Sequence, residues 1–406
     1  MDYEHPLRAK LASLKSAHNY RVFAELDPTN YAFPVSVHDG LTPPQPVVVW
    51  CSNDYLGMSR NPVVIAALCD AAHTAGAGSG GSRNIAGTTT YHSRLEATLA
   101  RLHGKARSLL FASAFLANEN LFRLLGKAYP ECVFFSDQQN HASMIEGMIQ
   151  SGAEKCIFRH NDVGELVSLL KSCAPNRPKI IAVESVYSVD GDTAPVNEIA
   201  EIASRYGAML IVDEVNGVGL YGEKGAGLTE ELGLTDKIDL IVGTFGKAFG
   251  LAGGYIAGSE TVIDYIRSFA PGFIFTTSPP TCIVAATLAS LQYVRENPEL
   301  RRLHRTRTEA VVTELRALGI PIMRGADRHI IPVLVGNSDR CKRLTSMLLK
   351  QYGIYLQPIT FPTVPVGTER VRITPTPFHT PEMIAHLAAS LDACWREFNL
   401  PRAECQ

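Results

Sequence analysis

A lysine and an aspartate, each shortly after an apolar segment, carry the most specific chemical signal in this sequence. Asp213 follows the run Met209–Val212, and Lys247 lies among glycines and phenylalanines after Leu240–Val242. A buried carboxylate is costly unless it meets a cation, and a lysine in apolar surroundings is a candidate for imine formation. Pyridoxal phosphate (PLP) needs such a pair, since a lysine binds it as a Schiff base and a carboxylate keeps its ring nitrogen protonated. On these two residues alone, a surface lysine and an unrelated helix-capping aspartate remain an alternative.

Three further polar segments follow apolar runs. Residues 113–118 follow a short apolar run and begin a helix, so their amides could bind a phosphate. Residues 136–143 place His141 in a polar loop, where an imidazole could stack on a flat ring or be an ordinary loop histidine. Residues 184–192 form the third segment. Since function gathers at the carboxyl ends of strands in open α/β sheets, we expect these segments to converge.

The elements that must position these residues are short β-branched runs alternating with helical segments. Such a pattern predicts an α/β fold with a mostly parallel central sheet covered on both faces. A helical stretch from about 281 to 317, a second β-run at 330–335 and a final helix at 381–398 predict a smaller C-terminal α/β domain. We therefore expect an N-terminal segment 1–50, a large domain 51–290 and a small domain 291–406.

Composition excludes several classes of protein. The 406 residues include 38 Lys and Arg against 40 Asp and Glu, a formal net charge of −2. A nucleic-acid-binding domain normally carries a basic surplus, so we expect no nucleic-acid partner. No apolar run approaches the roughly 18–20 residues that span a bilayer, and the acidic start lacks the apolar core of a signal peptide, so we expect a cytoplasmic protein without membrane contact. The nine cysteines and the histidines show no ligand-like spacing, so we expect reduced thiols and no metal site.

Six separated motifs resemble those of the α-oxoamine synthases, PLP enzymes that condense an amino acid with an acyl-CoA and release CO2. The likeness runs from about residue 20 to 395, and within the family it is nearest to the 5-aminolevulinate synthases. It implies PLP-dependent transferase fold type I and a homodimer with active sites at the subunit interface. It also implies condensation of glycine with succinyl-CoA to 5-aminolevulinate, coenzyme A and CO2. The motifs are Trp50–Met58, Gly78–Thr88, Asn140–Gly147, Phe158–Asp162, Phe269–Phe275 and Gln357–Pro365.

The resemblance also assigns roles at the cofactor. Lys247 would be the Schiff-base lysine and proton carrier, Asp213 would pair with the pyridine nitrogen, and His141 would stack over the ring. Ser188 and residue 216 would lie near the phenolic oxygen. The phosphate would be held by the backbone at Ala114 and Phe115, the hydroxyl of Thr244 and, from the neighbouring subunit, Thr277.

Further residues would bind the two substrates. Arg372 would clamp the amino-acid carboxylate, because a planar bidentate donor suits that group, and Asn53 would assist it. Thr363 lies on the expected closing loop. The succinyl pocket would comprise Arg21, Ser82, Asn84 and Ile85, and coenzyme A would contact Ser136 and Lys155.

Three positions depart from the family pattern. Asn216 replaces a histidine that hydrogen-bonds the phenolic oxygen of PLP; an amide can still donate but cannot become cationic. Ser82 replaces a threonine, and Val366 replaces an arginine. These departures leave room for a specialised variant that also cyclises aminolevulinyl-CoA to 2-amino-3-hydroxycyclopent-2-enone. A sister synthase that uses another acyl-CoA is a further hypothesis, and a catalytically silent regulatory subunit is the last.

Overall fold

A computed structural model describes residues 2–29, 31–326 and 328–403. The chain forms two compact units. The large unit comprises Asn53–Ser188 and Thr193–Arg302, and the small unit comprises the described residues up to Ser52, Val189–Asp192 and those from Leu303 onward. The described residues up to Ser52 therefore group with the described C-terminal part of the chain.

The large unit contains a seven-stranded sheet with the strand order β4-β10-β9-β8-β7-β5-β6. Every neighbouring pair from β9 to β6 is parallel, and β10 runs antiparallel to both β9 and β4. This arrangement confirms the mostly parallel sheet. The strands are β4 (Arg107–Phe111), β5 (Val133–Asp137), β6 (Glu154–Phe158), β7 (Lys179–Glu184), β8 (Met209–Asp213), β9 (Leu240–Thr244) and β10 (Gly254–Gly258).

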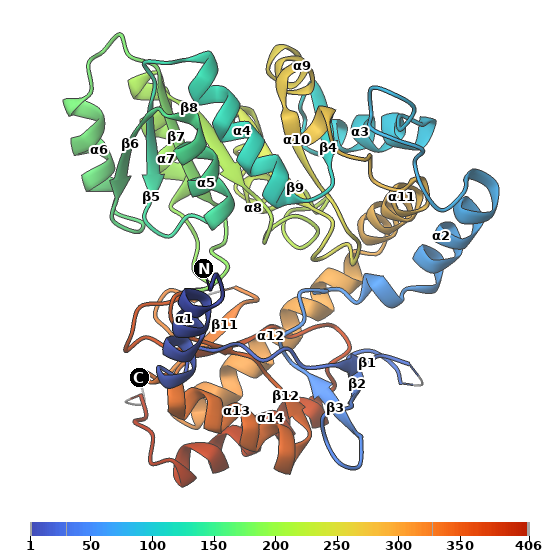
Figure 1. Ribbon diagram of the computed structural model, residues 1–406, viewed down its shortest axis with the longest axis vertical. Coiled ribbons are helices and arrows are strands. Elements are labelled where there is room, and N and C mark those ends of the chain that lie inside the picture. Colours follow the sequence, from blue (N-terminus) through green and yellow to red (C-terminus); the bar gives the residue numbers. More distant parts are fainter. Residues whose placement is uncertain (1, 30, 327, 404–406) are drawn as a thin grey trace. The chain divides into compact units, whose positions relative to one another are not determined.

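Helices cover both faces of this sheet, because successive residues of a strand point to opposite sides. In β8, Ile211 packs into the core that contains residues of α4, α5 and α9, whereas Leu210 and Val212 pack into the core that contains residues of α6 and α7. Figure 1 shows these helices around the sheet. The helices are α2 (Pro62–Ala75), α3 (Thr90–Leu102), α4 (Ala114–Ala128), α5 (Ala142–Ser151), α6 (Val163–Ser172), α7 (Val196–Tyr206), α8 (Leu228–Glu231), α9 (Glu260–Phe269), α10 (Pro271–Ile274) and α11 (Thr281–Glu296), with 3-10 turns η1 (Met58–Arg60) and η2 (Thr235–Lys237).

The helical stretch expected from 281 to 317 is two helices. α11 ends at Glu296, and α12 spans Pro298–Ala317. Pro298 has no N–H to donate to the preceding turn, so the first helix ends before it. The domain boundary expected at residue 290 falls within α11.

The small unit contains two sheets. One has the order β1-β2-β3-β12 and the other the order β11-β14-β13. Its core contains Trp50, Leu344, Val371 and Trp395. The elements are α1 (His5–Ser16), β1 (Leu26–Asp27), β2 (Val35–His38), β3 (Gln45–Val49), β11 (Ile331–Leu334), α13 (Ser338–Tyr352), β12 (Ile354–Tyr355), β13 (Pro358–Ile359), β14 (Arg370–Ile373) and α14 (Pro381–Glu397).

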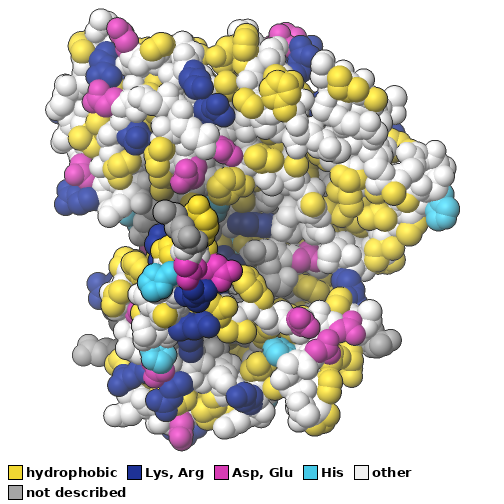
Figure 2. All heavy atoms as spheres, viewed as in Figure 1, with side chains coloured by type: hydrophobic (Ala, Val, Ile, Leu, Met, Phe, Trp, Pro, Cys, Tyr) yellow, Lys and Arg dark blue, Asp and Glu magenta, His cyan; other side chains and the backbone are white. Residues whose placement is uncertain are grey.

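The described surface carries charges of both signs, and the described cysteines form no disulfides. Lys, Arg, Asp and Glu side chains are interspersed on the face shown in Figure 2. The eight cysteines from Cys51 to Cys394 are free thiols, while Cys405 lies outside the described residues. No helix in the described ranges is both long and apolar enough to cross a membrane.

Candidate active site

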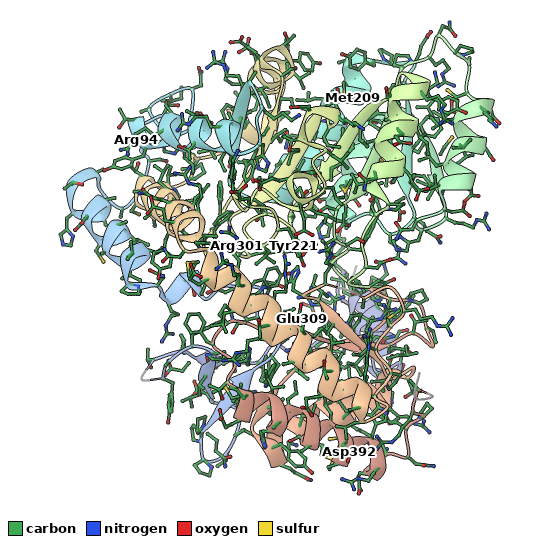
Figure 3. All side chains as sticks on the ribbon, turned by 180° about the vertical axis from the view of Figure 1, so that it is seen from behind. Arg94, Met209, Tyr221, Arg301, Glu309 and Asp392 are labelled. Atoms are coloured by element: carbon green, nitrogen blue, oxygen red, sulfur yellow. The ribbon has the colours of Figure 1, made fainter. Side chains whose placement is uncertain are left out.

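Polar residues meet where the parallel strands of the large unit end. Asp137, Glu184, Asp213 and Thr244 are the last residues of β5, β7, β8 and β9. Glu184 and Asp213 are register partners. Met209, labelled in Figure 3, begins β8, so Asp213 lies at the opposite end of that strand. The expected convergence of the polar segments at one sheet edge is confirmed for these residues.

Asp213 is a buried carboxylate held by two donors. Its Oδ2 accepts from Asn118 Nδ2 at 2.6 Å, and its Oδ1 accepts from the backbone N–H of Val215 at 2.8 Å. The side chain is 3% exposed. Burial raises the pKa of Asp213, and these two hydrogen bonds act in the opposite direction. A cation next to this carboxylate would therefore be strongly favoured.

The Asn118 amide connects Asp213 to the histidine of the polar loop. Besides Asp213, Asn118 Nδ2 donates to Ser143 Oγ at 3.1 Å. Ser143 Oγ in turn lies 2.7 Å from Nδ1 of His141, which caps α5 by accepting from the backbone N–H of Ser143. The pKa of His141 is lowered, mainly by desolvation of the ring, while Asp213 opposes this shift. Asn118, which links the two, is a site residue that the sequence analysis did not single out.

Glu184 adds a second buried carboxyl group at this edge. It is 3% exposed. Burial and the nearby charge of Asp213 raise its pKa well above the ordinary value. Two hydrogen bonds support the ionised form of Asp213, whereas burial and the neighbouring charge of Asp213 favour the protonated form of Glu184.

Lys247 lies three residues after the end of β9 and is half-buried. Its Nζ donates to Oδ1 of Asn216. Asn216 also accepts from the hydroxyl of Tyr55 at 3.2 Å and donates through Nδ2 to the carbonyl of Val186 at 3.0 Å. The amine is thus fixed at the same sheet edge as Asp213, through residues from three separate segments.

The start of α4 offers backbone N–H groups to an anion. Ser113 caps this helix by accepting from Leu116 N, so Ala114 and Phe115 form its first turn. A Cβ on Gly254 would lie 2.3 Å from Ala114 N, so only glycine allows β10 to approach the helix start this closely. Thr244 is part of the same region, but its hydroxyl already donates to Gly253 O at 3.0 Å and accepts from Gly246 N at 3.1 Å.

The remaining expected site residues of the large unit fall into separate places. Ser82 and Thr277 face each other in an isolated antiparallel bridge, and Ile85 is 79% exposed. Ser136 is buried in β5, where its hydroxyl accepts from Asn140 Nδ2 at 2.8 Å. Exposed positions are Asn53, Asn84 and Lys155, and Ser188 is half-buried.

In the small unit, two expected site residues contact each other. Arg21 Nη2 donates to Thr363 Oγ1 at 2.8 Å, although 342 positions separate them. Both line a cavity of about 1020 Å³ whose other lining residues include Lys342 and Tyr355. Arg372 lies on β14 opposite Pro332 of β11.

Comparisons with known proteins agree with this architecture. The family model described as aminotransferase class I and II matches residues 45–391. The chain is 48% identical to 5-aminolevulinate synthase 1 of Cereibacter sphaeroides over 407 residues, which cover 100% of this chain and 99% of that relative. It is 47% identical to 5-aminolevulinate synthase of Paracoccus denitrificans, with 99% of each chain covered. The structure of Sphingomonas wittichii serine palmitoyltransferase is similar, with a TM-score of 0.90, 27% identity and coverage of 98% of this chain and 99% of that one.

Proposed function

Because the chain belongs to the aminotransferase class I and II family, and within it to the α-oxoamine synthases, we propose that it condenses glycine with succinyl-CoA. The products are 5-aminolevulinate, coenzyme A and CO2. The observation that carries the proposal is the placement of Lys247 and buried Asp213 at the carboxyl edge of one mostly parallel sheet, as PLP-dependent transferases of fold type I require.

The residues of this edge fit PLP. A buried carboxylate with an amide donor suits a protonated ring nitrogen, a half-buried amine suits covalent attachment, and a helix start suits a phosphate. Asn118 Oδ1 is buried without a hydrogen-bond partner beside this carboxylate, as expected where a further group completes the site. Bound PLP supplies an electron sink for the bond that breaks at the glycine α-carbon.

Each residue then has one task. Lys247 would hold the cofactor covalently and would accept the α-proton of glycine at Nζ. Asp213 holds the proton on the ring nitrogen, and Asn118 supports Asp213 in its ionised form. His141, whose pKa is lowered by burial, would stack on the ring. The phosphate would be held by the backbone at Ala114 and Phe115 with Thr244, and by Thr277 of a second subunit. Ser188 and Asn216 would serve the phenolic oxygen.

Further residues would serve substrate recognition. Arg372 binds the glycine carboxylate with help from Asn53, and Arg21 with Thr363 binds the succinyl carboxylate. Ser82, Asn84 and Ile85 complete the acyl pocket, and Ser136 and Lys155 serve coenzyme A. The exposure of Ile85 and of Phe275, at 79% and 83%, supports a homodimer in which a second copy covers this part of the large unit.

The test is a panel of acyl-CoA substrates with glycine, alanine or serine and mass analysis of the products. We expect 5-aminolevulinate from glycine with succinyl-CoA and its loss in Lys247→Ala, which should also lose the absorbance band of lysine-bound PLP. A different aminoketone would identify a sister synthase, and a cyclic aminoketone from aminolevulinyl-CoA would identify the specialised variant. Absence of any product from a PLP-loaded protein would refute the proposal.

A further inference from the structure

The amide of Asn216 faces Lys247 with its oxygen. Three groups contact this side chain: the carbonyl of Val186, the hydroxyl of Tyr55 and the amine of Lys247. Asn216 is 2% exposed, so these contacts are made inside the protein.

The partners determine which way the amide is turned. A carbonyl oxygen can only accept and a lysine amine mainly donates, so Val186 requires the NH2 group and Lys247 requires the oxygen. The opposite orientation would place two oxygens together at Val186 and two donors together at Lys247. The Tyr55 hydroxyl can donate or accept, and therefore fits either way.

We propose that Asn216 is a positioning residue for Lys247: its amide oxygen holds the amine at the sheet edge and favours the protonated form of that amine. This inference rests on the proposed function, in which the Nζ lone pair of Lys247 takes the proton from the glycine α-carbon. The C–H electron pair stays on the carbon, and the new N–H bond gives an ammonium that donates to Asn216 Oδ1. A hydrogen bond to the charged form makes the lysine a stronger base.

Other ionisable groups also face Lys247. They are His141 at the start of α5, Glu184 at the end of β7 and Asp213 at the end of β8. Burial favours the neutral form of all three. The contribution of these neighbours to the pKa of Lys247 is therefore reduced, and that of the neutral acceptor in direct contact with the amine becomes relatively larger. A histidine at position 216, as in the family pattern, would place a group that can become cationic against the lysine.

Two nearly isosteric substitutions test the role. In cofactor-free protein, competitive acetylation across a pH series, with mass spectrometry of the Lys247 peptide, measures the pKa of this amine. Asn216→Leu removes the acceptor, and we expect the pKa to fall by about one unit, so that acetylation at a fixed pH below the pKa rises about tenfold. Asn216→Asp supplies a charged acceptor, and we expect a shift of similar size in the opposite direction. No shift, or shifts of the same sign in both variants, would overturn the inference.

Tyr55→Phe is the matched control, because it removes a hydroxyl from the same oxygen and leaves the contact with Lys247. We expect the lysine pKa to stay the same or rise slightly. A fall equal to that of Asn216→Leu would mean that general loosening of the pocket, rather than the acceptor, sets the pKa. The acetylation readout needs neither cofactor nor substrate, so failure of the proposed function, seen as absence of aminoketone, is distinguishable from failure of this inference. In holoenzyme, the pH titration of the visible absorbance band should show the same order of variants.

Discussion

Asn118 Nδ2 lies 2.6 Å from Asp213 Oδ2, and this buried hydrogen bond joins two residues that are 95 positions apart in the chain. Burial alone would favour protonated Asp213 by raising its pKa. The hydrogen bond from the Asn118 amide is the largest of the contributions that lower this pKa. The acid that must face a ring nitrogen is thus supported by a neutral donor from the first helix after β4.

We predict that Asn118→Leu weakens PLP binding. The substitution keeps the volume of the side chain but removes the donor, so the pKa of Asp213 should rise further and its pairing with a protonated ring nitrogen should weaken. A hydrogen bond to a charged group contributes about 1.5–3 kcal/mol, so the dissociation constant for PLP should rise by about tenfold or more, measured by titrating cofactor-free protein. Asn120→Leu on the same helix, which removes the hydrogen bonds with Leu116 and Gly272, is the control. Equal affinity in Asn118→Leu and wild type would contradict the prediction.

We predict that the cofactor-free chain loses stability as the pH rises above 4.5, the ordinary pKa of a glutamate. The folded chain keeps Glu184 protonated up to its raised pKa, whereas the unfolded chain releases that proton near 4.5. In this window the folded state binds more protons, so the free energy of unfolding falls with pH. Chemical denaturation at several pH values should show a shallower fall in Glu184→Gln. The exposed control is Glu201→Gln. If the free energy of unfolding changed with pH equally steeply in Glu184→Gln and in this control, the prediction would be wrong.

We predict that Glu214 stabilises the loop after β8 by accepting hydrogen bonds. Its Oε1 accepts from Thr229 N at 2.6 Å, and its Oε2 accepts from Leu228 N at 3.1 Å and from Ser185 Oγ at 2.7 Å. Glu214→Gln exchanges one of these acceptors for a donor and leaves at least one buried group unpaired. We expect a loss of about 1–3 kcal/mol in the free energy of unfolding, measured by urea denaturation, and almost none for Glu201→Gln. A loss no larger than that of this control would show that the loop does not need the carboxylate.

The ion pair between Arg370 and Asp190 is predicted to stabilise the small unit. The two side chains are only 3% and 17% exposed. Asp190→Ala leaves a buried guanidinium without its counter-ion, which should cost about 3–5 kcal/mol. Glu299→Ala, which breaks a pair whose side chains are 73% and 75% exposed, should cost under about 1 kcal/mol. Thermal denaturation of both variants checks the contrast, and equal losses would contradict it.

Arg21 is predicted to select the acyl substrate. Arg21→Leu removes the guanidinium that contacts Thr363 and should raise KM for succinyl-CoA at least about tenfold, since a charged contact is lost. KM for an uncharged acyl-CoA should change much less. Arg8→Leu, in an exposed ion pair near the N-terminus, is the control. A uniform change across all acyl-CoA substrates would point to a general effect on folding instead.

The sequence by itself determined the chemistry and the sheet. Strand ends are local features, because an apolar run followed by polar residues marks where a buried strand reaches solvent, and parallel strands align those ends. The sheet-edge positions of Asp213 and Lys247 followed from this rule. The resemblance to a family supplied the cofactor and substrate roles, which no structural feature of a single segment encodes.

Tertiary structure decided what depends on contacts between distant segments. Asn118 donates to Asp213 across 95 positions of the chain. Asn216 turns its oxygen to Lys247, because folding brings the carbonyl of Val186 to the NH2 group of the same amide. Likewise, the N-terminal residues join the small unit because β3 pairs in parallel with β12, some three hundred positions later. Hydrogen-bond direction and long-range strand pairing depend on which groups face each other in space, and periodicity along one chain does not contain that information.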